Sequence, residues 1–186
     1  ILQRPMETDH RVQGLANDQV AADWPALSEA ELAWLRHHYP ALEDGCDVLW
    51  HSPRPFSAAA LVRSGPRRYL VKRHHARVRT AALLGEEHRF IAHLAAAGLP
   101  VVDVLHTRHG ATAIERDSWT YELHAEGAGQ DLYRDSPSWT PPSEPAHARE
   151  AGAGLARLHL AAADYHAPPR GTHLLVAPDD LLRAPD

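Results

Sequence analysis

The chain contains a single lysine, Lys72, in the stretch YLVKRHH at 69–75, although it has 19 lysine and arginine residues in all. Arginines such as Arg68 and Arg73 stand close to it on both sides. A lysine ammonium is a compact point charge on a flexible stem, whereas an arginine guanidinium is a wide planar fork. The choice of lysine therefore indicates a position that needs a compact cation, with chance as the alternative explanation.

A carboxylate that could serve such a cation lies 15 residues further along the chain, at Glu87. It falls within a set of apolar residues spaced by three and four, which predicts the buried face of a helix; the set is Leu83, Leu84, Phe90, Ile91 and Leu94. Glu86 lies about 100° around the helix and can face water. A carboxylate in a buried stripe needs a cation or hydrogen-bond donors to keep its charge.

Lys72 itself is predicted to lie on a strand. The runs 47–52, 57–64 and 67–74 are short and rich in apolar residues, and Gly65-Pro66 supplies a turn between the second and third. Together they predict an antiparallel meander. Side chains alternate along a strand, so Lys72 shares one face with Leu70, and the neighbours Tyr69 and Val71 point to the other.

Three helices are expected. The first begins at Ser28, where Glu31 three residues later completes a capping box, and ends near Tyr39 before Pro40. Leu27 and Leu32 can form a hydrophobic staple at its start. The second runs within 76–100 and stops at Gly98 and Pro100. The third runs over about 146–165 and carries a stripe of mostly small residues suited to packing on another helix.

The remaining segments complete the expected order. Residues 101–107 and 111–126 predict two or three more strands, with a hairpin near His109-Gly110. Residues 1–26 have little periodicity and are expected to form an irregular extension, and the proline- and serine-rich stretch 136–145 is expected to be a surface loop. Trp119, Tyr121 and Leu123 alternate as core residues would, although they could also wall a pocket.

Composition excludes several classes of protein. The net charge of −5 argues against a broad nucleic-acid surface, and the arginines at 63–79 are better explained as a solvated hairpin face. The one cysteine, Cys46, excludes an internal disulfide and fits a reducing compartment. No stretch approaches the roughly 18–20 apolar residues of a membrane span. We expect a cytoplasmic protein with neither a membrane nor a nucleic-acid partner.

The 15 histidines do not predict a metal site. His37-His38 and His74-His75 are adjacent pairs whose side chains point in different directions, and no C-x-x-C or H-E-x-x-H spacing occurs. We therefore expect no protein-bound metal in this chain.

The ordered set of elements resembles the small lobe of the protein-kinase-like fold, specifically its aminoglycoside phosphotransferase and choline kinase branch. YLVKRH matches the lysine strand, and EHRFIAHLAAAGLPVVDVL matches the helix and strand that follow. YELHAEGAGQDLY matches the connector between the lobes, and AGAGLARLHLAA the first large-lobe helix. The resemblance covers about residues 45–165. It departs from protein kinases at HSPRPFSAAA, where no glycine-rich cover over the phosphates is present.

This resemblance implies an α+β fold with a five-stranded antiparallel sheet and one long helix. Residues 1–44 would form an extension with a helix, residues 45–126 the small lobe, and residues 127–186 the connector and the beginning of a truncated large lobe. It also implies the function of the whole protein: an ATP-dependent phosphotransferase that phosphorylates a hydroxyl of a small molecule. The sequence leaves open both the identity of this acceptor and the oligomeric state of the protein.

The same resemblance assigns candidate cofactor-binding residues. Lys72 would contact the α- and β-phosphates of ATP, with Glu87 holding its ammonium in place. The backbone of Glu122, Leu123, His124 and Ala125 would meet the adenine edge. Ser57, with some help from Arg54, would touch phosphate. The alternative for the first pair is an exposed strand-edge lysine and a glutamate paired with an arginine.

The two aspartate motifs that kinases of this branch use for catalysis and for Mg²⁺ binding are absent from the sequence. Kinases of this branch need a catalytic aspartate, usually in a His-Gly-Asp stretch, and a later aspartate for Mg²⁺. After LARLHLAA only about two dozen residues remain, and His173 and Asp179-Asp180 do not form those motifs. We expect no catalytic residue and no metal ligand in this chain, with the Mg²⁺ ligands in the part of the large lobe that is missing. A fragment is favoured over a non-catalytic relic.

Two further functions stay open. A non-catalytic nucleotide-binding or regulatory pseudokinase module would keep the scaffold without phosphoryl transfer. An unrelated α+β interaction domain would have a different strand order, with Lys72 pointing to solvent.

Overall fold

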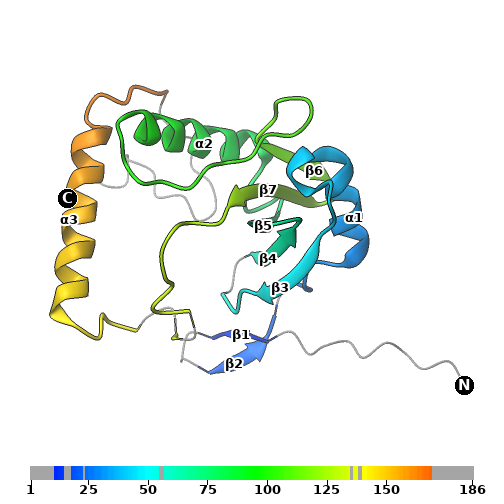
Figure 1. Cartoon of the computed structure of the whole chain (residues 1–186), viewed down its shortest axis with the longest axis horizontal. Coiled ribbons are helices and arrows are strands. Elements are labelled where there is room, and N and C mark those ends of the chain that lie inside the picture. Colours follow the sequence, from blue (N-terminus) through cyan, green and yellow to red (C-terminus); the bar gives the residue numbers. More distant parts are fainter. Residues whose placement is uncertain are drawn as a thin grey trace, which may run out of the picture.

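The computed structural model describes residues 11–14, 18–22, 24–54, 57–134, 136–137 and 140–168. Its centre is an antiparallel five-stranded sheet (Figure 1) in the order β3-β4-β5-β7-β6. The strands are β3 Asp47–His51, β4 Ala58–Ser64, β5 Arg67–His75, β6 Ala113–Arg116 and β7 Trp119–Ala125. The predicted α+β fold with a five-stranded antiparallel sheet is therefore confirmed.

Three α-helices accompany the sheet, and they are α1 Glu29–His38, α2 Ala81–Ala96 and α3 Pro145–Ala162. A short 3₁₀ turn, Pro40–Leu42, follows α1. None of the helices in the described part of the chain is long and apolar enough to cross a membrane.

The expectation of an irregular N-terminal extension is wrong for part of residues 1–26. Strands β1, Arg11–Gln13, and β2, Gln19–Ala21, pair antiparallel as a separate two-stranded sheet. Each strand has only three residues, which is too short for a hydrophobic periodicity to be read from the sequence. Residues 1–10 lie outside the described part.

Helix α1 begins as the sequence predicts. The Glu31 carboxylate accepts from the backbone N–H of Ser28 at 2.8 Å, and the Ser28 hydroxyl oxygen accepts from the backbone N–H of Glu31 at 3.3 Å. This is the reciprocal capping box. Leu27 and Leu32, the two staple residues, are both buried.

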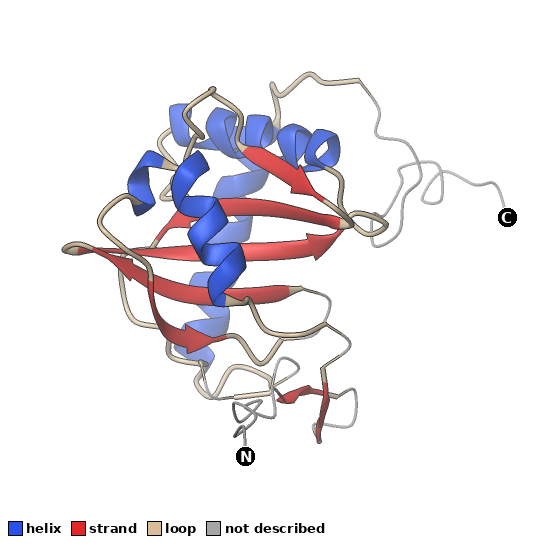
Figure 2. Cartoon of the chain, turned by 90° about the vertical axis from the view of Figure 1, so that its right-hand side faces the viewer, coloured by secondary structure: helices blue, strands red, loops and turns tan. Residues whose placement is uncertain are grey.

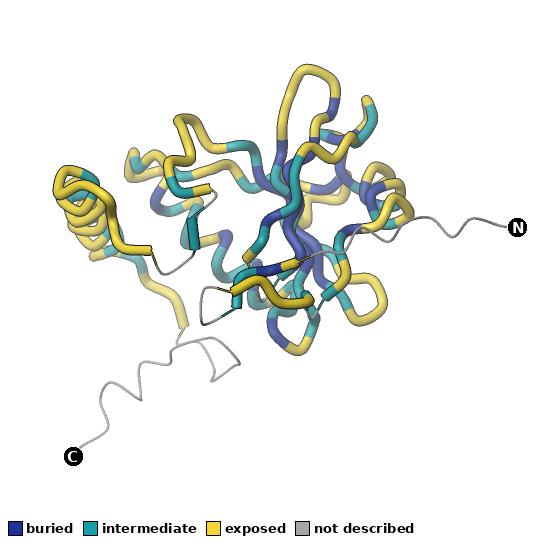
Figure 3. Tube along the Cα trace, turned by 90° about the horizontal axis from the view of Figure 1, so that it is seen from below, coloured by how far each residue is buried: buried dark blue, intermediate teal, exposed yellow. Residues whose placement is uncertain are grey.

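The apolar core lies between α1 and one face of the sheet, which Figure 2 shows with α1 in front of the strands and Figure 3 shows as the dark blue centre of the tube. Tyr69 and Val71 of β5 and Tyr121 and Leu123 of β7 belong to this core. Trp119 packs against it partly buried. The prediction that these alternating residues form a core is confirmed, and Lys72 consequently lies on the opposite face.

The buried face of α2 differs by one position from the predicted one. Leu84, His88 and Leu94 are buried, whereas the side chain of Glu87 is 33% exposed. Leu84 and Leu94 belong to the predicted face, and His88 is the buried position that the prediction missed. A histidine was not counted as a core residue in the sequence pattern, and this shifted the predicted stripe toward Glu87.

The segment between α2 and β7 also departs from expectation. Residues 101–107 form one isolated bridge, Val104 with His124, rather than a strand. The chain does turn near His109-Gly110, where Thr107 N–H donates to Ala111 C=O at 2.8 Å and Gly110 has a φ of 81°. The hairpin that joins two paired strands is instead at Asp117-Ser118, between β6 and β7. Asp117 supplies the positive φ of 55° that such a tight turn requires, and aspartate tolerates it better than most residues.

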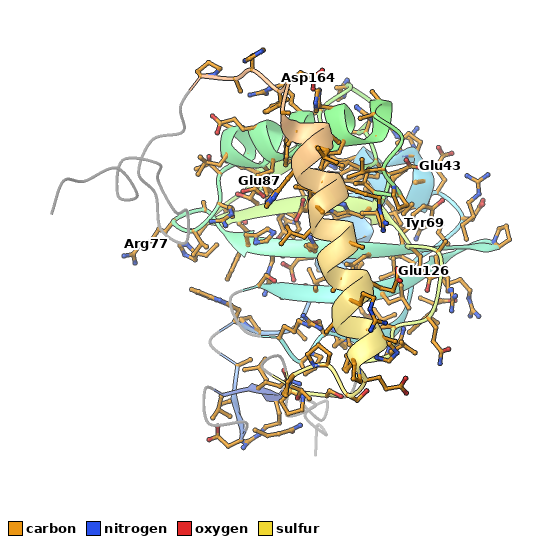
Figure 4. All side chains as sticks on the ribbon, turned by 90° about the vertical axis from the view of Figure 1, so that its left-hand side faces the viewer. Glu43, Tyr69, Arg77, Glu87, Glu126 and Asp164 are labelled. Carbon is orange, nitrogen blue, oxygen red and sulfur yellow. The ribbon has the colours of Figure 1, made fainter. Side chains whose placement is uncertain are left out.

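Helix α3 does not pack through its small-residue stripe. Within the described chain it contacts α2, and no residue of α3 is buried. Leu155 and Leu160 are 54% and 77% exposed. Figure 4 looks onto this helix, which stands in front of the sheet on the side away from α1. The expectation of close helix packing along the whole stripe is therefore wrong for the described residues.

A largely buried ion pair between Arg73 of β5 and Glu31 of α1 lies at the edge of the apolar core. Arg73, whose side chain is 2% exposed, donates to Glu31 Oε1 at 2.6 Å, and the Tyr121 hydroxyl donates to the same oxygen at 2.7 Å. Burial alone would raise the pKa of Glu31, but hydrogen bonds from Arg73, Ser28 and Tyr121 outweigh it and hold the pKa at about 2. This ion pair fixes α1 to β5 and β7.

The lowered pKa of Glu31 predicts an acid-sensitive contribution to stability. The folded pKa of about 2 lies below the ordinary value of 4.5, so the contribution is complete above about pH 4.5 and is lost as pH falls toward 2. Glu31→Gln should lower the free energy of unfolding at pH 7, and its difference from the wild type should shrink between pH 5 and pH 2. Urea unfolding across that range measures it. A Glu31→Gln difference that stays constant across this range contradicts the assignment.

Candidate functional site: the carboxylate of Glu122 and its donors

Lys72 forms an ion pair across the sheet. In the antiparallel register of β5 and β7 it lies directly opposite Glu122, and its Nζ is 3.3 Å from Glu122 Oε1. The Glu122 side chain is 4% exposed, whereas that of Lys72 is 34% exposed. Opposite charges at directly facing positions on one face of a sheet attract at short range, so the strand register alone brings this pair together.

The predicted pairing of Lys72 with Glu87 is not the one that the structure forms. Glu87 Oε1 lies 3.3 Å from Arg79 Nε, and the carboxylate within ion-pair distance of Lys72 in the described chain is that of Glu122. Arg79 immediately precedes α2, so it reaches Glu87, which Figure 4 labels beside this helix, from the neighbouring turn. Lys72 instead finds its partner on the adjacent strand, which is closer than the helix.

Four donors converge on the Glu122 carboxylate. Lys72 and His74 contact Oε1, with His74 Nε2 at 3.0 Å. His88 Nε2 and His124 Nε2 contact Oε2, at 2.7 Å and 2.8 Å. We refer to Lys72, His74, His88, Glu122 and His124 as the Glu122 cluster. An ionised carboxylate offers about four lone-pair positions, so these donors satisfy it completely.

The environment keeps Glu122 ionised. Burial alone would raise the pKa of its carboxyl group, but hydrogen bonds from His124, His74 and His88 and the charge of Lys72 lower the pKa well below its ordinary value. The carboxylate is therefore a fixed negative charge, nearly removed from water, that is balanced by its neighbours.

Strand alternation explains how the sequence builds the cluster. Lys72 and His74 are two residues apart on β5, and Glu122 and His124 are two residues apart on β7, so each pair projects from one face of the sheet. His88 reaches the same point from the buried face of α2. The sequence pattern K-x-H and E-x-H was a usable signal, but only the register of β5 against β7 reveals that the two pairs meet.

The histidines of the cluster are not fully satisfied. An ionised carboxylate can only accept, so His88 and His124 carry their protons on Nε2 when they bind Glu122. Their Nδ1 atoms are then acceptors, and both are buried with no hydrogen-bond partner among the described residues. The two rings meet nearly at right angles, at an interplanar angle of 79° and a centroid distance of 5.8 Å.

The predicted adenine-binding segment is placed inside the sheet. Residues 122–125 lie in β7, paired with β5 on one side. On the other side Leu123 C=O accepts from Leu105 N–H at 2.8 Å, and Ala125 N–H donates to Asp103 C=O at 2.9 Å. Glu126 N–H still bonds to Arg68 C=O at 3.2 Å. The backbone of Leu123 and Ala125 is thus already hydrogen-bonded, and the connector begins after Glu126 rather than at 122.

The loop between β3 and β4 holds the remaining candidates. Ser57 is half-buried immediately before β4, and Arg54 is exposed, with its backbone N–H donating to Ser52 Oγ at 3.3 Å. Residues 55 and 56 of this loop lie outside the described part, as do His173 and Asp179-Asp180. Neither Ser57 nor Arg54 contacts the Glu122 cluster through any bond that the structure records.

A cavity of about 700 Å³ has His88 in its lining. It is bounded by α2, including Gly85, His88 and Arg89, and by the segment 102–113, including Val104 and His106. His88 is therefore the member of the Glu122 cluster that borders this cavity.

Comparison with known proteins agrees with the fold. Residues 56–185 match the family described as the phosphotransferase enzyme family, APH. Because this match spans more than half of the chain, the chain belongs to that family. A comparison with curated proteins finds no significant match.

Two solved structures share the fold. One is an amicoumacin kinase in complex with AMP-PNP, Ca²⁺ and Ami, with 14% sequence identity, a TM-score of 0.58, and coverage of 75% of this chain and 41% of that one. The other is a spectinomycin phosphotransferase in complex with ADP and spectinomycin, with 12% identity, a TM-score of 0.52, and coverage of 78% and 40%. This chain therefore spans about two fifths of the length of either neighbour. The interpretation as an unrelated α+β interaction domain is excluded.

The asymmetry of the Glu122 cluster predicts unequal effects on stability. Glu122→Gln replaces an acceptor by a group that presents an amide donor to three imidazole donors, and we expect it to lower the free energy of unfolding by about 3 kcal/mol. Lys72→Met leaves the carboxylate with three histidine donors and should cost about 1 kcal/mol or less. Urea unfolding at pH 7 compares the two. Equal losses would mean that Lys72, and not the histidines, carries the charge balance.

Proposed function

We propose that this chain is the nucleotide-binding part of an ATP-dependent phosphotransferase that phosphorylates a hydroxyl of a small molecule. The observation that carries the proposal is Lys72, a lone lysine on the central strand of a phosphotransferase-family sheet, held by a buried carboxylate. The bound AMP-PNP and ADP in the two structural neighbours support the choice of nucleotide.

Lys72 is the residue that would bind phosphate. Its ammonium is a compact cation on a flexible stem, suited to donating to oxygens of the α- and β-phosphates. Binding requires it to turn from Glu122 toward the nucleotide. Because His74, His88 and His124 also donate to Glu122, Lys72 can leave without stranding a buried, unpaired charge. Glu87, on α2, remains a candidate to hold the ammonium in the nucleotide-bound state.

The backbone of the connector after β7 would bind the adenine edge of the nucleotide. Since the backbone of residues 122–125 is engaged within the sheet and Glu126 N–H is bonded to Arg68 C=O, the backbone groups of residues 127–129 are the better candidates. Ser57, at the start of β4, stays a candidate phosphate contact.

Magnesium would neutralise charge on the transferring phosphates, and its ligands are expected elsewhere in the whole protein. Mg²⁺ prefers oxygen ligands in octahedral geometry. The Glu122 cluster offers three imidazole nitrogens and only one carboxylate, so it does not fit this ion. The general base that positions the acceptor hydroxyl is likewise expected in the large lobe. Leu155 and Leu160 of α3 are exposed and are available for that lobe to cover.

Nucleotide binding tests the role of Lys72. Isothermal titration calorimetry with Mg-ATP should show at least tenfold weaker binding for Lys72→Ala, and Lys72→Arg should not restore it because the planar guanidinium cannot occupy the same space. Arg67→Ala, at an exposed position on the same strand, is the matched control and should bind as the wild type does. Unchanged affinity in both Lys72 variants would refute the proposal.

The full-length gene product distinguishes an enzyme from a pseudokinase module. The pairing of Lys72 with Glu122 instead of Glu87 is the observation that keeps the second possibility in view. Transfer of ³²P from labelled ATP to a panel of hydroxyl-bearing antibiotics, amino alcohols and sugars supports the enzyme. Nucleotide binding that depends on Lys72 without transfer to any acceptor supports the non-catalytic module.

A further inference from the structure

We propose that His88, Glu122 and His124 form a binding site for a divalent transition metal ion, with Zn²⁺ as the best fit. The ligand atoms are His88 Nε2, His124 Nε2 and a carboxylate oxygen of Glu122, and all lie within 4.8 Å of one another. All three residues are buried, at 5%, 4% and 3% exposure. The sequence spacing gave no sign of this site because its members come from α2 and β7.

The geometry is close to that of a zinc site. His88 Nε2 and His124 Nε2 approach the same oxygen, Oε2, at 2.7 Å and 2.8 Å. Around a tetrahedral Zn²⁺ with bonds of about 2.0–2.1 Å, neighbouring ligand atoms lie about 3.4 Å apart. An ion between the three groups therefore needs the two nitrogen–oxygen separations to lengthen by about 0.6 Å and the Nε2 protons to be lost. Side-chain rotation accommodates movements of this size.

The donor set selects the class of metal. Two imidazole nitrogens and one carboxylate oxygen suit Zn²⁺ and its first-row neighbours, whereas Mg²⁺ and Ca²⁺ favour sites made of oxygen alone. The Glu122 carboxylate supplies the oxygen ligand of this set. Two imidazoles and one carboxylate leave the fourth tetrahedral position to water or to a further side chain.

The side chain nearest to the other carboxylate oxygen, Oε1, is a candidate for that fourth position. His74 Nε2 is 3.0 Å from Oε1 and can either orient the carboxylate or become the fourth ligand. Lys72 also contacts Oε1, not Oε2. Its side chain is one third exposed and flexible, so it can move toward solvent when a second cation occupies the cluster.

An ion also has a route to the site. The cavity of about 700 Å³ bounded by α2 and residues 102–113 has His88 in its wall. A hydrated ion can approach His88 from this side and exchange its waters for the ligands one at a time.

Metal titration of the chain without nucleotide tests the site. After dialysis against a chelator, Co²⁺ should bind at one equivalent with the intense visible absorption of a tetrahedral ion, and Zn²⁺ should displace it. His88→Ala and His124→Ala should each weaken Zn²⁺ binding at least 100-fold. His109→Ala, at an exposed position outside the cluster, should bind as the wild type does. Circular dichroism confirms that each variant is folded.

A second readout protects the test against unfolding of a variant. Zn²⁺ at 100 times its dissociation constant should stabilise the wild type by about 2.7 kcal/mol, seen as a rise in melting temperature that Mg²⁺ does not produce. Absence of one-equivalent binding, binding that survives both histidine substitutions, or an equal response to Mg²⁺ would each overturn the proposal. Because no nucleotide is present, these outcomes are independent of whether Lys72 binds ATP.

Discussion

The arrangement around the functional face of the sheet depends on one constraint, the burial of a charged carboxylate. Glu122 is 3% exposed, and an ionised carboxylate at such a position is tolerated only if donors surround it. The chain recruits them from β5, β7 and α2. These bonds therefore do more than balance a charge: they fix α2 against the sheet at a defined rotation, with His88 facing inward and Glu87 turned toward Arg79.

The two faces of the central strands use charge in different ways. On the face toward α1, Glu31, Arg73 and Tyr121 form a compact network at the edge of the apolar core. On the other face, Lys72 shares its carboxylate with three histidines. The first arrangement is suited to holding a helix in place. The second gives a partly exposed cation that can be exchanged, which is what a phosphate-binding residue or a competing metal ion requires.

Family membership and local geometry give complementary information. The match over residues 56–185 and the shared fold define a phosphotransferase scaffold, but they do not dictate which carboxylate holds the lysine. That choice follows from strand register, since Lys72 and Glu122 face each other directly. Helix α3 shows the same division: its sequence is that of a packing helix, yet Leu155 and Leu160 are exposed in the described chain.

The sequence by itself determined the features that depend on near neighbours. The strands β3 to β5, the capping box at Ser28 and Glu31, the end of α2 near Gly98 and the alternation that puts Lys72 opposite the core all follow from local propensity and periodicity. Only the tertiary structure decided the partner of Lys72, the inward turn of His88 and the meeting of three histidines on Glu122. Those depend on strand register and helix rotation, where a shift of one residue reverses which side chains meet, and no local pattern encodes either.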